Sequence, residues 1–115
     1  MGRENVQALV ILANAFMNVH RSRLAELALR GRLPAIYGFR EFAEAGGLLS
    51  YGASLHALHK DAARYVDKIL KGADPGELPV EQPTRFELVI NGKTAQALGL
   101  SVPDVILALT DEVLE

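Results

Sequence analysis

Cysteine is absent from this 115-residue chain, which excludes disulfides, thiolate catalysis and zinc sites built from thiolates. The absence leaves the redox compartment open. A basic excess is also lacking, since 12 Lys and Arg residues stand against 14 Asp and Glu residues. The sequence therefore carries no electrostatic footprint of nucleic-acid binding. No apolar run approaches the roughly 20 residues needed to span a bilayer.

The N-terminus also lacks the features of a secretory signal. Its first residues, Met-Gly-Arg-Glu-Asn-Val-Gln, hold one basic residue and no long apolar region before a small-residue cleavage site. A chain expressed as written is therefore expected in the cytoplasm.

Apolar runs alternate with helical patterns along the chain, in the composition of an ordinary globular domain. The runs predict strands at residues 8–13, 34–37, 48–51 and 86–90. Helical spacing predicts helices at residues 19–30, 40–45, 54–71 and 93–98, with a last turn or helix after Pro103. The first strand has no polar alternation, which is typical of a strand covered on both faces. Residues 14–18 are expected to form a loop, and Asn18 to cap the following helix.

Two of these strands end in the same way, with a tyrosine followed by a glycine. In open α/β sheets, ligands bind at the carboxyl ends of the strands. Aromatic rings there are expected to be incompletely buried, so that a ligand could stack on them; core packing is the equally weighted alternative. The candidate ligand-binding residues are Asn14, Phe16, Tyr37, Gly38, Phe39, Tyr51 and Gly52.

Three side-chain groups resemble catalytic or metal sites, but each has a plainer explanation. His56 and His59 have metal-ligand spacing on one helix, yet no further ligands are evident. Glu41 and Glu44 share a helix face that is expected to be solvated. Ser22 with His20 and Asp61 could be imagined as a catalytic triad, but no Gly-x-Ser-x-Gly turn surrounds Ser22. The chain has neither a dinucleotide-binding fingerprint nor a P-loop. We therefore expect no catalysis, no metal and no cofactor, which counts against an enzyme on a flavodoxin-like scaffold.

Several stretches together resemble a known family. They are Leu-Pro-Ala-Ile-Tyr-Gly at 33–38, Gly-Gly-Leu-Leu-Ser-Tyr-Gly at 46–52 and Ala-Ala-Arg-Tyr-Val-Asp-Lys-Ile-Leu-Lys-Gly at 62–72, followed by residues 78–91 and 93–100. Their order and spacing are similar to the C-terminal part of ABC-transporter substrate-binding proteins, and closest to the branch for tryptophan and other aromatic amino acids. The resemblance implies an α/β fold with a mostly parallel sheet and helices on both faces, as in one lobe of a periplasmic-binding-protein-like fold.

The resemblance also implies a location and a role. Members of this family work in the periplasm, where two lobes hinged around a small solute deliver it to an ABC permease. Residues 1–115 would form a single partial domain corresponding to the C-terminal lobe, with the first lobe missing. Phe39 stands where many members have an acidic residue that could meet a ligand's amino group. Gly92 replaces a bulkier apolar residue at the start of the following helix.

The helix predicted at residues 54–71 would pack on the first lobe in such a protein. Its apolar stripe consists of Leu55, Leu58, Ala62, Tyr65, Val66 and Ile69. Without that lobe, the stripe predicts a homodimer built through this helix, unless the helix folds back onto its own sheet. The first functional hypothesis is a truncated or partial solute-binding component of an ABC-type importer. The alternative is a free-standing, self-associating α/β domain without transport function.

Overall fold

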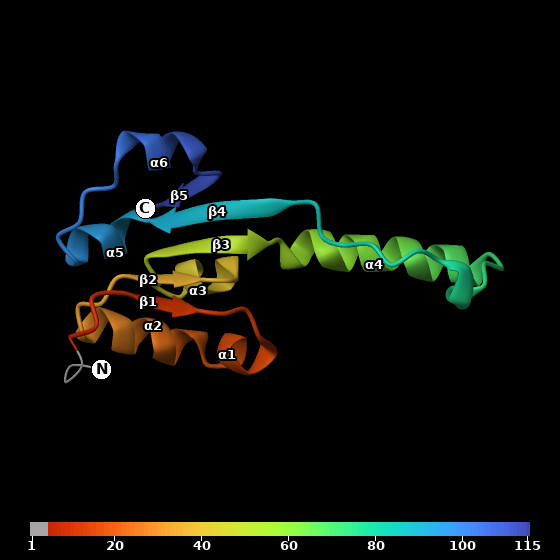
Figure 1. The fold of residues 1–115 in the computed structure, drawn as a ribbon, viewed down its shortest axis with the longest axis horizontal. Helices are drawn as coiled ribbons and strands as arrows, with labels where there is room; N and C mark the ends of the chain where they lie inside the picture. Colours follow the sequence, from red (N-terminus) through yellow and green to blue (C-terminus); the bar gives the residue numbers. More distant parts are fainter. Residues whose placement is uncertain (1–4) are drawn as a thin grey trace.

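The structure is a computed structural model that describes residues 5–115. Along the chain, its elements are β1 (Leu9–Ile11), α1 (Ala15–Val19), α2 (Arg21–Arg30), β2 (Ala35–Tyr37), α3 (Arg40–Glu44), β3 (Leu49–Ala53), α4 (Leu55–Leu70), the 3-10 helix η2 (Pro75–Glu77), β4 (Phe86–Asn91), α5 (Gly92–Ala97), α6 (Asp104–Leu109) and β5 (Glu112–Leu114) (Figure 1). Within residues 5–115, no helix has the length and apolar character required to cross a bilayer.

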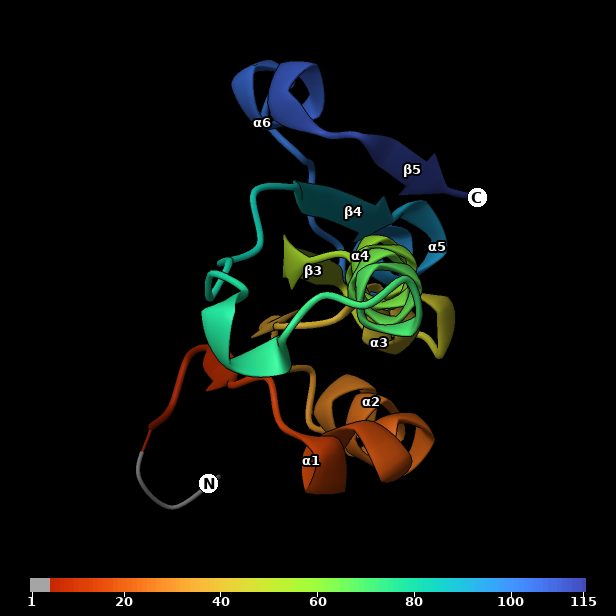
Figure 2. The ribbon, with the colours of Figure 1, turned by 90° about the vertical axis from the view of Figure 1, so that its right-hand side faces the viewer.

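The five strands form one sheet in the order β1-β2-β3-β4-β5. The pairs β1–β2, β2–β3 and β4–β5 are parallel, and only β3–β4 is antiparallel. The expected α/β fold with a mostly parallel sheet is therefore confirmed. Helices α2, α3 and α5 lie on one side of the sheet, and α6 lies on the other side beside β4 and β5 (Figure 2).

The core lies between the sheet and α2 and α3. Phe42 of α3 is fully buried, and its ring stacks on Tyr37 of β2 with centroids 4.7 Å apart. Ala28 of α2 and Ala35 of β2 complete this buried cluster. Small residues on α2 let the helix approach the sheet closely, while the two rings fill the remaining space.

Arg40 ties α3 to the far strands of the sheet. Its guanidinium pairs with Glu44 at 2.7 Å and Glu87 at 3.7 Å, and also contacts Glu112. The hydrogen bonds that the guanidinium donates to the Glu44 and Glu112 carboxylates raise the pKa of Arg40 above its usual value, so the side chain stays charged. This network joins α3 to β4 and β5.

The expected loop at residues 14–18 is wrong, because a short helix, α1, begins at Ala15. Its N-cap is Asn14, whose side-chain oxygen accepts a hydrogen bond from the Met17 amide at 2.9 Å. Asn18 lies inside α1 and does not cap the next helix, which begins after His20 without a side-chain cap. The sequence signal for an N-cap was therefore assigned to the wrong asparagine.

Two expectations about the strands also need correction. β1 is an edge strand with one neighbour, and 71% of Val10 is exposed, so β1 is not covered on both faces. β5 was not anticipated, because its three residues begin with Glu112 and offer no apolar run. Its place is fixed by parallel pairing with β4, where Ile90 lies opposite Val113.

Helix α4 projects away from the sheet (Figure 1), and none of its residues is buried. The segment that returns from it, residues 73–85, runs beside the helix: the Tyr65 hydroxyl donates to the Pro79 carbonyl at 2.7 Å. Because α4 projects from the sheet, the Cα radius of gyration is 17.4 Å. A compact chain of this length would have about 13 Å. The helix does not fold back onto its own sheet.

Candidate functional site

The carboxyl ends of β1, β2 and β3 meet at one edge of the sheet. The parallel register places Ile11 beside Tyr37, and Tyr37 beside Ser50, so the residues after these strands are neighbours. A Cβ atom added at Gly38 would lie 2.5 Å from the Cβ of Ala13. One added at Gly52 would overlap the carbonyl oxygen of Gly38. The strand ends can approach this closely because both positions are glycine.

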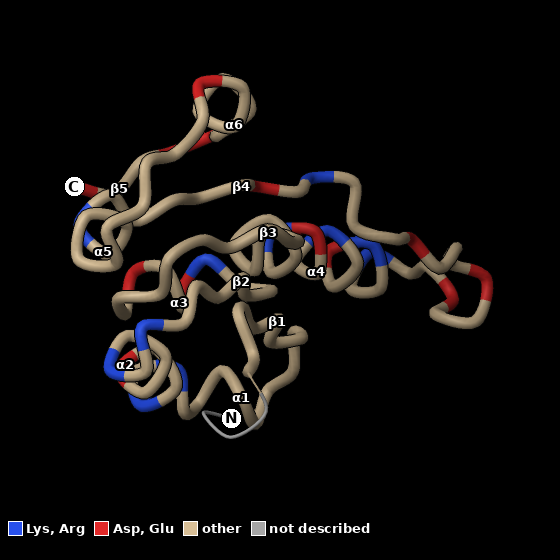
Figure 3. Tube along the Cα trace, turned by 60° about the vertical axis from the view of Figure 1, so that its left-hand side comes forward, with Lys and Arg blue, Asp and Glu red and all other residues tan. Residues whose placement is uncertain are grey.

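An apolar hollow of about 370 Å³ lies over these strand ends, and we call it the strand-end depression. Its volume falls at the small end of ligand pockets, which span roughly 300–1,000 Å³. Among the described residues, no Lys, Arg, His, Asp or Glu lines it. The tube view likewise shows β1 and β2 without charged residues (Figure 3). The lining residues are Val10, Ile11, Leu12, Ala13, Ile36, Tyr37, Gly38, Phe39, Tyr51, Gly52, Ala53 and Phe86.

Two aromatic rings form one wall of the strand-end depression. Tyr51 of β3 and Phe86 of β4 stack with centroids 6.1 Å apart and planes 24° apart. Their exposed fractions are 55% and 52%, so both rings are accessible. Sequence reasoning missed Phe86. In the antiparallel pairing of β3 with β4, Phe86 lies opposite Ala53, which places it diagonally next to Tyr51; this pairing is a property of the fold and not a signal in the sequence.

Tyr37 lies at a strand end, but its ring is not available to a ligand. Only 2% of the residue is exposed, and burial raises the pKa of its phenol. Gly47 leaves room for the ring, because a Cβ atom there would lie 2.6 Å from it. The expectation of an incompletely buried Tyr37 ring was wrong, and core packing is its role. Tyr37 borders the depression through its position at the end of β2.

The remaining candidates divide between the depression and its surroundings. Phe39 borders the depression and also packs, half-buried, against the core cluster. Asn14 and Phe16 do not line it. Asn14 caps α1, and Phe16 contacts His20 edge to face with ring centroids 4.7 Å apart. The structure therefore brings together Tyr37, Gly38, Phe39, Tyr51 and Gly52.

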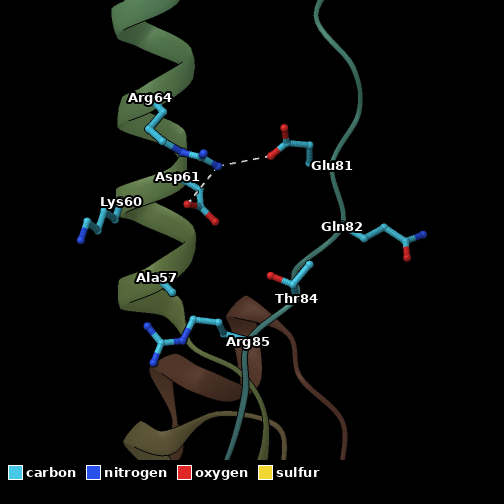
Figure 4. Close-up of a pocket in the computed structure, with 8 residues that line it drawn as sticks. All are labelled: Ala57, Lys60, Asp61, Arg64, Glu81, Gln82, Thr84 and Arg85. Carbon is cyan, nitrogen blue, oxygen red and sulfur yellow. Dashed lines mark hydrogen bonds and ion pairs between the residues drawn. The ribbon is translucent and has the colours of Figure 1, made fainter.

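A larger hollow, of about 580 Å³, lies between α4 and the return segment of residues 73–85 (Figure 4). It is lined by charged residues, and the Arg64 guanidinium holds both Asp61 at 3.2 Å and Glu81 at 3.3 Å. The pair with Glu81 ties the segment to the helix, and the pair with Asp61 lies within α4, so both carboxylates are accounted for. Residues 5–115 hold no group of three or more potential metal ligands. The strand-end depression is the better candidate, since neighbouring strand ends converge on it.

The sequence model for the family described as ABC transporter substrate binding protein matches residues 2–114. The chain belongs to this family. The resemblance carried by residues 33–38 and 46–52 is therefore confirmed. Substrate-binding proteins of ABC transporters bind small solutes, generally without catalysis, and typically act in the periplasm or outside the cell.

Solved structures agree with this membership. A conserved domain protein from Vibrio cholerae O1 biovar El Tor is 25% identical with a TM-score of 0.88, over 96% of this chain and 37% of that chain. An ABC domain from Streptococcus pneumonia in complex with L-Trp is 25% identical with a TM-score of 0.87, over 96% and 38%. CD0873, an adhesive substrate-binding protein from Clostridium difficile in a ligand-free open form, shares the fold: it is 20% identical with a TM-score of 0.62, over 93% and 36%.

This member of the substrate-binding family thus spans 37% and 38% of the length of the first two structures. A search of curated proteins gave no match.

Proposed function

We propose that this chain supplies one wall of the solute-binding site of an ABC-type importer and performs no catalysis. The observation that carries this proposal is the convergence of three strand ends on an apolar depression, made possible by Gly38 and Gly52. The chain spans 37% and 38% of the first two structures, which supports a part of a longer protein. Following the family resemblance, we place it as the C-terminal lobe of a two-lobed protein, with a second lobe providing the opposite wall. The proposed place of action is the periplasm or the cell surface, with an ABC permease as partner.

The lining of the depression favours a solute with a planar, apolar group. Tyr51 and Phe86 offer two accessible ring faces, on which an aromatic group can stack offset or edge to face. Phe39 supplies a third apolar side chain and no charge for a ligand's ammonium group. L-Trp, bound by the pneumococcal neighbour, contains such a planar group. The charged groups of a solute would then face the opposite wall.

One wall alone is expected to bind weakly. A complete ligand pocket buries roughly 70–90% of a small ligand's surface, and a single wall offers about half of the contacts. We therefore expect no amino acid to bind this chain as a monomer with micromolar affinity. Calorimetric titration with aromatic and branched amino acids measures this affinity. A micromolar dissociation constant for the monomer would contradict the proposal that the chain forms only one wall of the site.

Ligand fluorescence tests the proposed function, because the chain contains no tryptophan and all indole emission comes from the ligand. We expect saturable binding of L-tryptophan and of indole, with comparable affinity because the depression contacts the ring. L-Alanine, which has the same charged groups without the ring, should not compete. Tyr51→Ala and Phe86→Ala should each weaken binding about tenfold, corresponding to a stacking loss of about 1.4 kcal/mol.

Phe16→Ala is the matched control, since Phe16 is an exposed aromatic residue outside the depression. It should leave binding unchanged. Equal losses in Phe16→Ala and Tyr51→Ala, or competition by L-alanine as strong as by indole, would contradict a ring-binding depression.

As the alternative to packing on a second lobe, we propose that the stripe of α4 is an interface with a second copy of the chain. Its members Leu58 and Tyr65 are half-buried, whereas Val66 is 55% and Ile69 is 40% exposed. Val66→Asp should disrupt association, and Lys60→Asp, on the opposite side of α4, should not. Light scattering is the measurement; a wild-type mass near 12.5 kDa at micromolar concentration would contradict this interface.

A further inference from the structure

Arg40 links parts of the sheet that lie far apart in the sequence. It is the first residue of α3, two positions after Gly38 at the end of β2. Its guanidinium reaches Glu87 of β4 at 3.7 Å and also contacts Glu112 of β5. The side chains of Arg40 and Glu87 are only 30% and 25% exposed, so their attraction is screened less than that of a fully exposed pair.

Glu87 lies next to the aromatic wall of the strand-end depression. In the antiparallel pairing of β3 with β4, Glu87 is opposite Gly52 and follows Phe86. Successive side chains of a strand point to opposite faces of the sheet. Glu87 therefore points to the side of the sheet on which it meets Arg40, and Phe86 points to the side of the depression. An anchor on Glu87 fixes the backbone that carries the Phe86 ring.

The backbone ladder is weak at this end of the β3–β4 pair. Figure 1 shows β3 leading into α4, and the return segment of residues 73–85 leading into β4, at the same end of the sheet. Here the Ser54 amide donates to the Arg85 carbonyl at 3.4 Å, beyond the usual range of about 2.7–3.2 Å. At the other end, the Asn91 amide donates to the Leu48 carbonyl at 2.8 Å. A side-chain anchor therefore has most effect where β4 begins.

We propose that Arg40 is a positioning residue of the strand-end depression, which holds the start of β4 against β3 and so keeps the Phe86 ring beside Tyr51. This role rests on the proposed function, in which the solute stacks on these two rings. Arg40 itself does not line the depression. Its effect passes through Glu87: without this ion pair the start of β4 separates from β3, and the two rings no longer form one wall.

Amide hydrogen exchange tests the positioning without any ligand. Hydrogen-bonded pairs alternate along an antiparallel ladder, and the bonds at both ends of the β3–β4 pair place Gly52 and Glu87 in such a pair. Arg40→Met and Glu87→Gln should each speed exchange of the Gly52 amide about fivefold, the effect of losing one partly exposed ion pair. Exchange of the Asn91 amide should stay unchanged. A merely structural role would speed exchange at Asn91 at least as much as at Gly52.

Glu44→Gln is the matched control, since Glu44 pairs with the same guanidinium at 2.7 Å from within α3. This substitution also removes a carboxylate from Arg40, but it breaks no link between α3 and β4. It should leave the exchange of Gly52 unchanged. Glu87→Gln is milder than Arg40→Met because the guanidinium keeps its other two partners, and circular dichroism reports whether each variant is folded.

Titration with indole connects the positioning to the site. Indole carries no charge, so the altered charge of the variants does not change its attraction directly. Arg40→Met and Glu87→Gln should each weaken indole binding about fivefold, and Glu44→Gln should leave it unchanged.

The outcomes separate the role of Arg40 from the proposed function. A wild-type chain that does not bind indole would overturn the proposed function, and with it any role of Arg40 at a solute site. If the wild-type chain binds indole, three results would overturn the positioning role alone: unchanged binding in Arg40→Met and Glu87→Gln, unchanged exchange at Gly52, or equal effects of Glu44→Gln and Glu87→Gln.

Discussion

Gly52→Ala perturbs the point where β3 passes closest to the end of β2. The added Cβ atom would overlap the carbonyl oxygen of Gly38, and would lie 3.1 Å from the carbonyl carbon of that residue. Both obstructing atoms belong to the backbone, so no side-chain rotation can relieve the contact. The strand ends must therefore move apart, and the strand-end depression changes shape with them.

The expected loss of stability follows from two opposing effects. Overpacking costs about 1–3 kcal/mol, and a backbone obstacle places this substitution near the upper end. Alanine also restricts the unfolded chain more than glycine does, which stabilises the folded state by about 0.4–1 kcal/mol. The net loss in the free energy of unfolding is then about 2 kcal/mol. For a domain of this size, such a loss lowers the melting temperature by about 8 °C.

Urea unfolding followed by circular dichroism measures this loss. The matched control is Gly76→Ala on the return segment, where the nearest atom to an added Cβ is a side-chain oxygen of Asp74 at 3.4 Å. Its stability should stay within about 0.5 kcal/mol of wild type. A Gly52→Ala chain as stable as Gly76→Ala would refute the close approach of β2 and β3 on which the depression rests.

Two further substitutions test the packing that supports the site. Phe42→Ala removes the fully buried ring stacked on Tyr37 and should cost about 3–5 kcal/mol in urea unfolding, whereas Phe16→Ala should cost under about 1 kcal/mol. Arg40→Met breaks three ion pairs with glutamates and should cost about 1–2 kcal/mol. Salt near 1 M screens such pairs, so the difference between Arg40→Met and wild type should shrink in thermal melts at about that concentration. A salt-independent difference would show that the side chain stabilises by packing.

The sequence predicted the strands that are long or buried, because burial leaves an apolar run. The runs near Leu9, Ile36, Leu49 and Val89 all correspond to strands. β5 was missed, since a three-residue strand beginning with an acidic residue depends on its neighbour β4 for its conformation. The resemblance implied that α4 would pack on a first lobe, and folding back onto its own sheet was the alternative. The helical period of the sequence could not decide between them.

The candidate site was predicted at the right sheet edge, but the burial of its rings was not predicted. Tyr37 and Tyr51 have the same local signature, an aromatic residue before glycine. Tyr37 lies opposite Ser50, so Tyr51, one residue further, points to the other face of the sheet. That shift buries Tyr37 in the core and exposes Tyr51 beside Phe86. Register between strands decides this, and it is a property of the whole sheet.

The most direct test of the ligand site is an amide-resolved NMR titration of this chain with indole and L-tryptophan. We expect saturable shifts of the amides of Gly38, Gly52 and Ala53, which border the strand-end depression, with the amides of α5 and β5 unchanged. The same residues should respond to both ligands. Shifts confined to the charged hollow near Lys60 and Arg85, or no saturable shift at millimolar ligand, would show that the strand-end depression is not the ligand site.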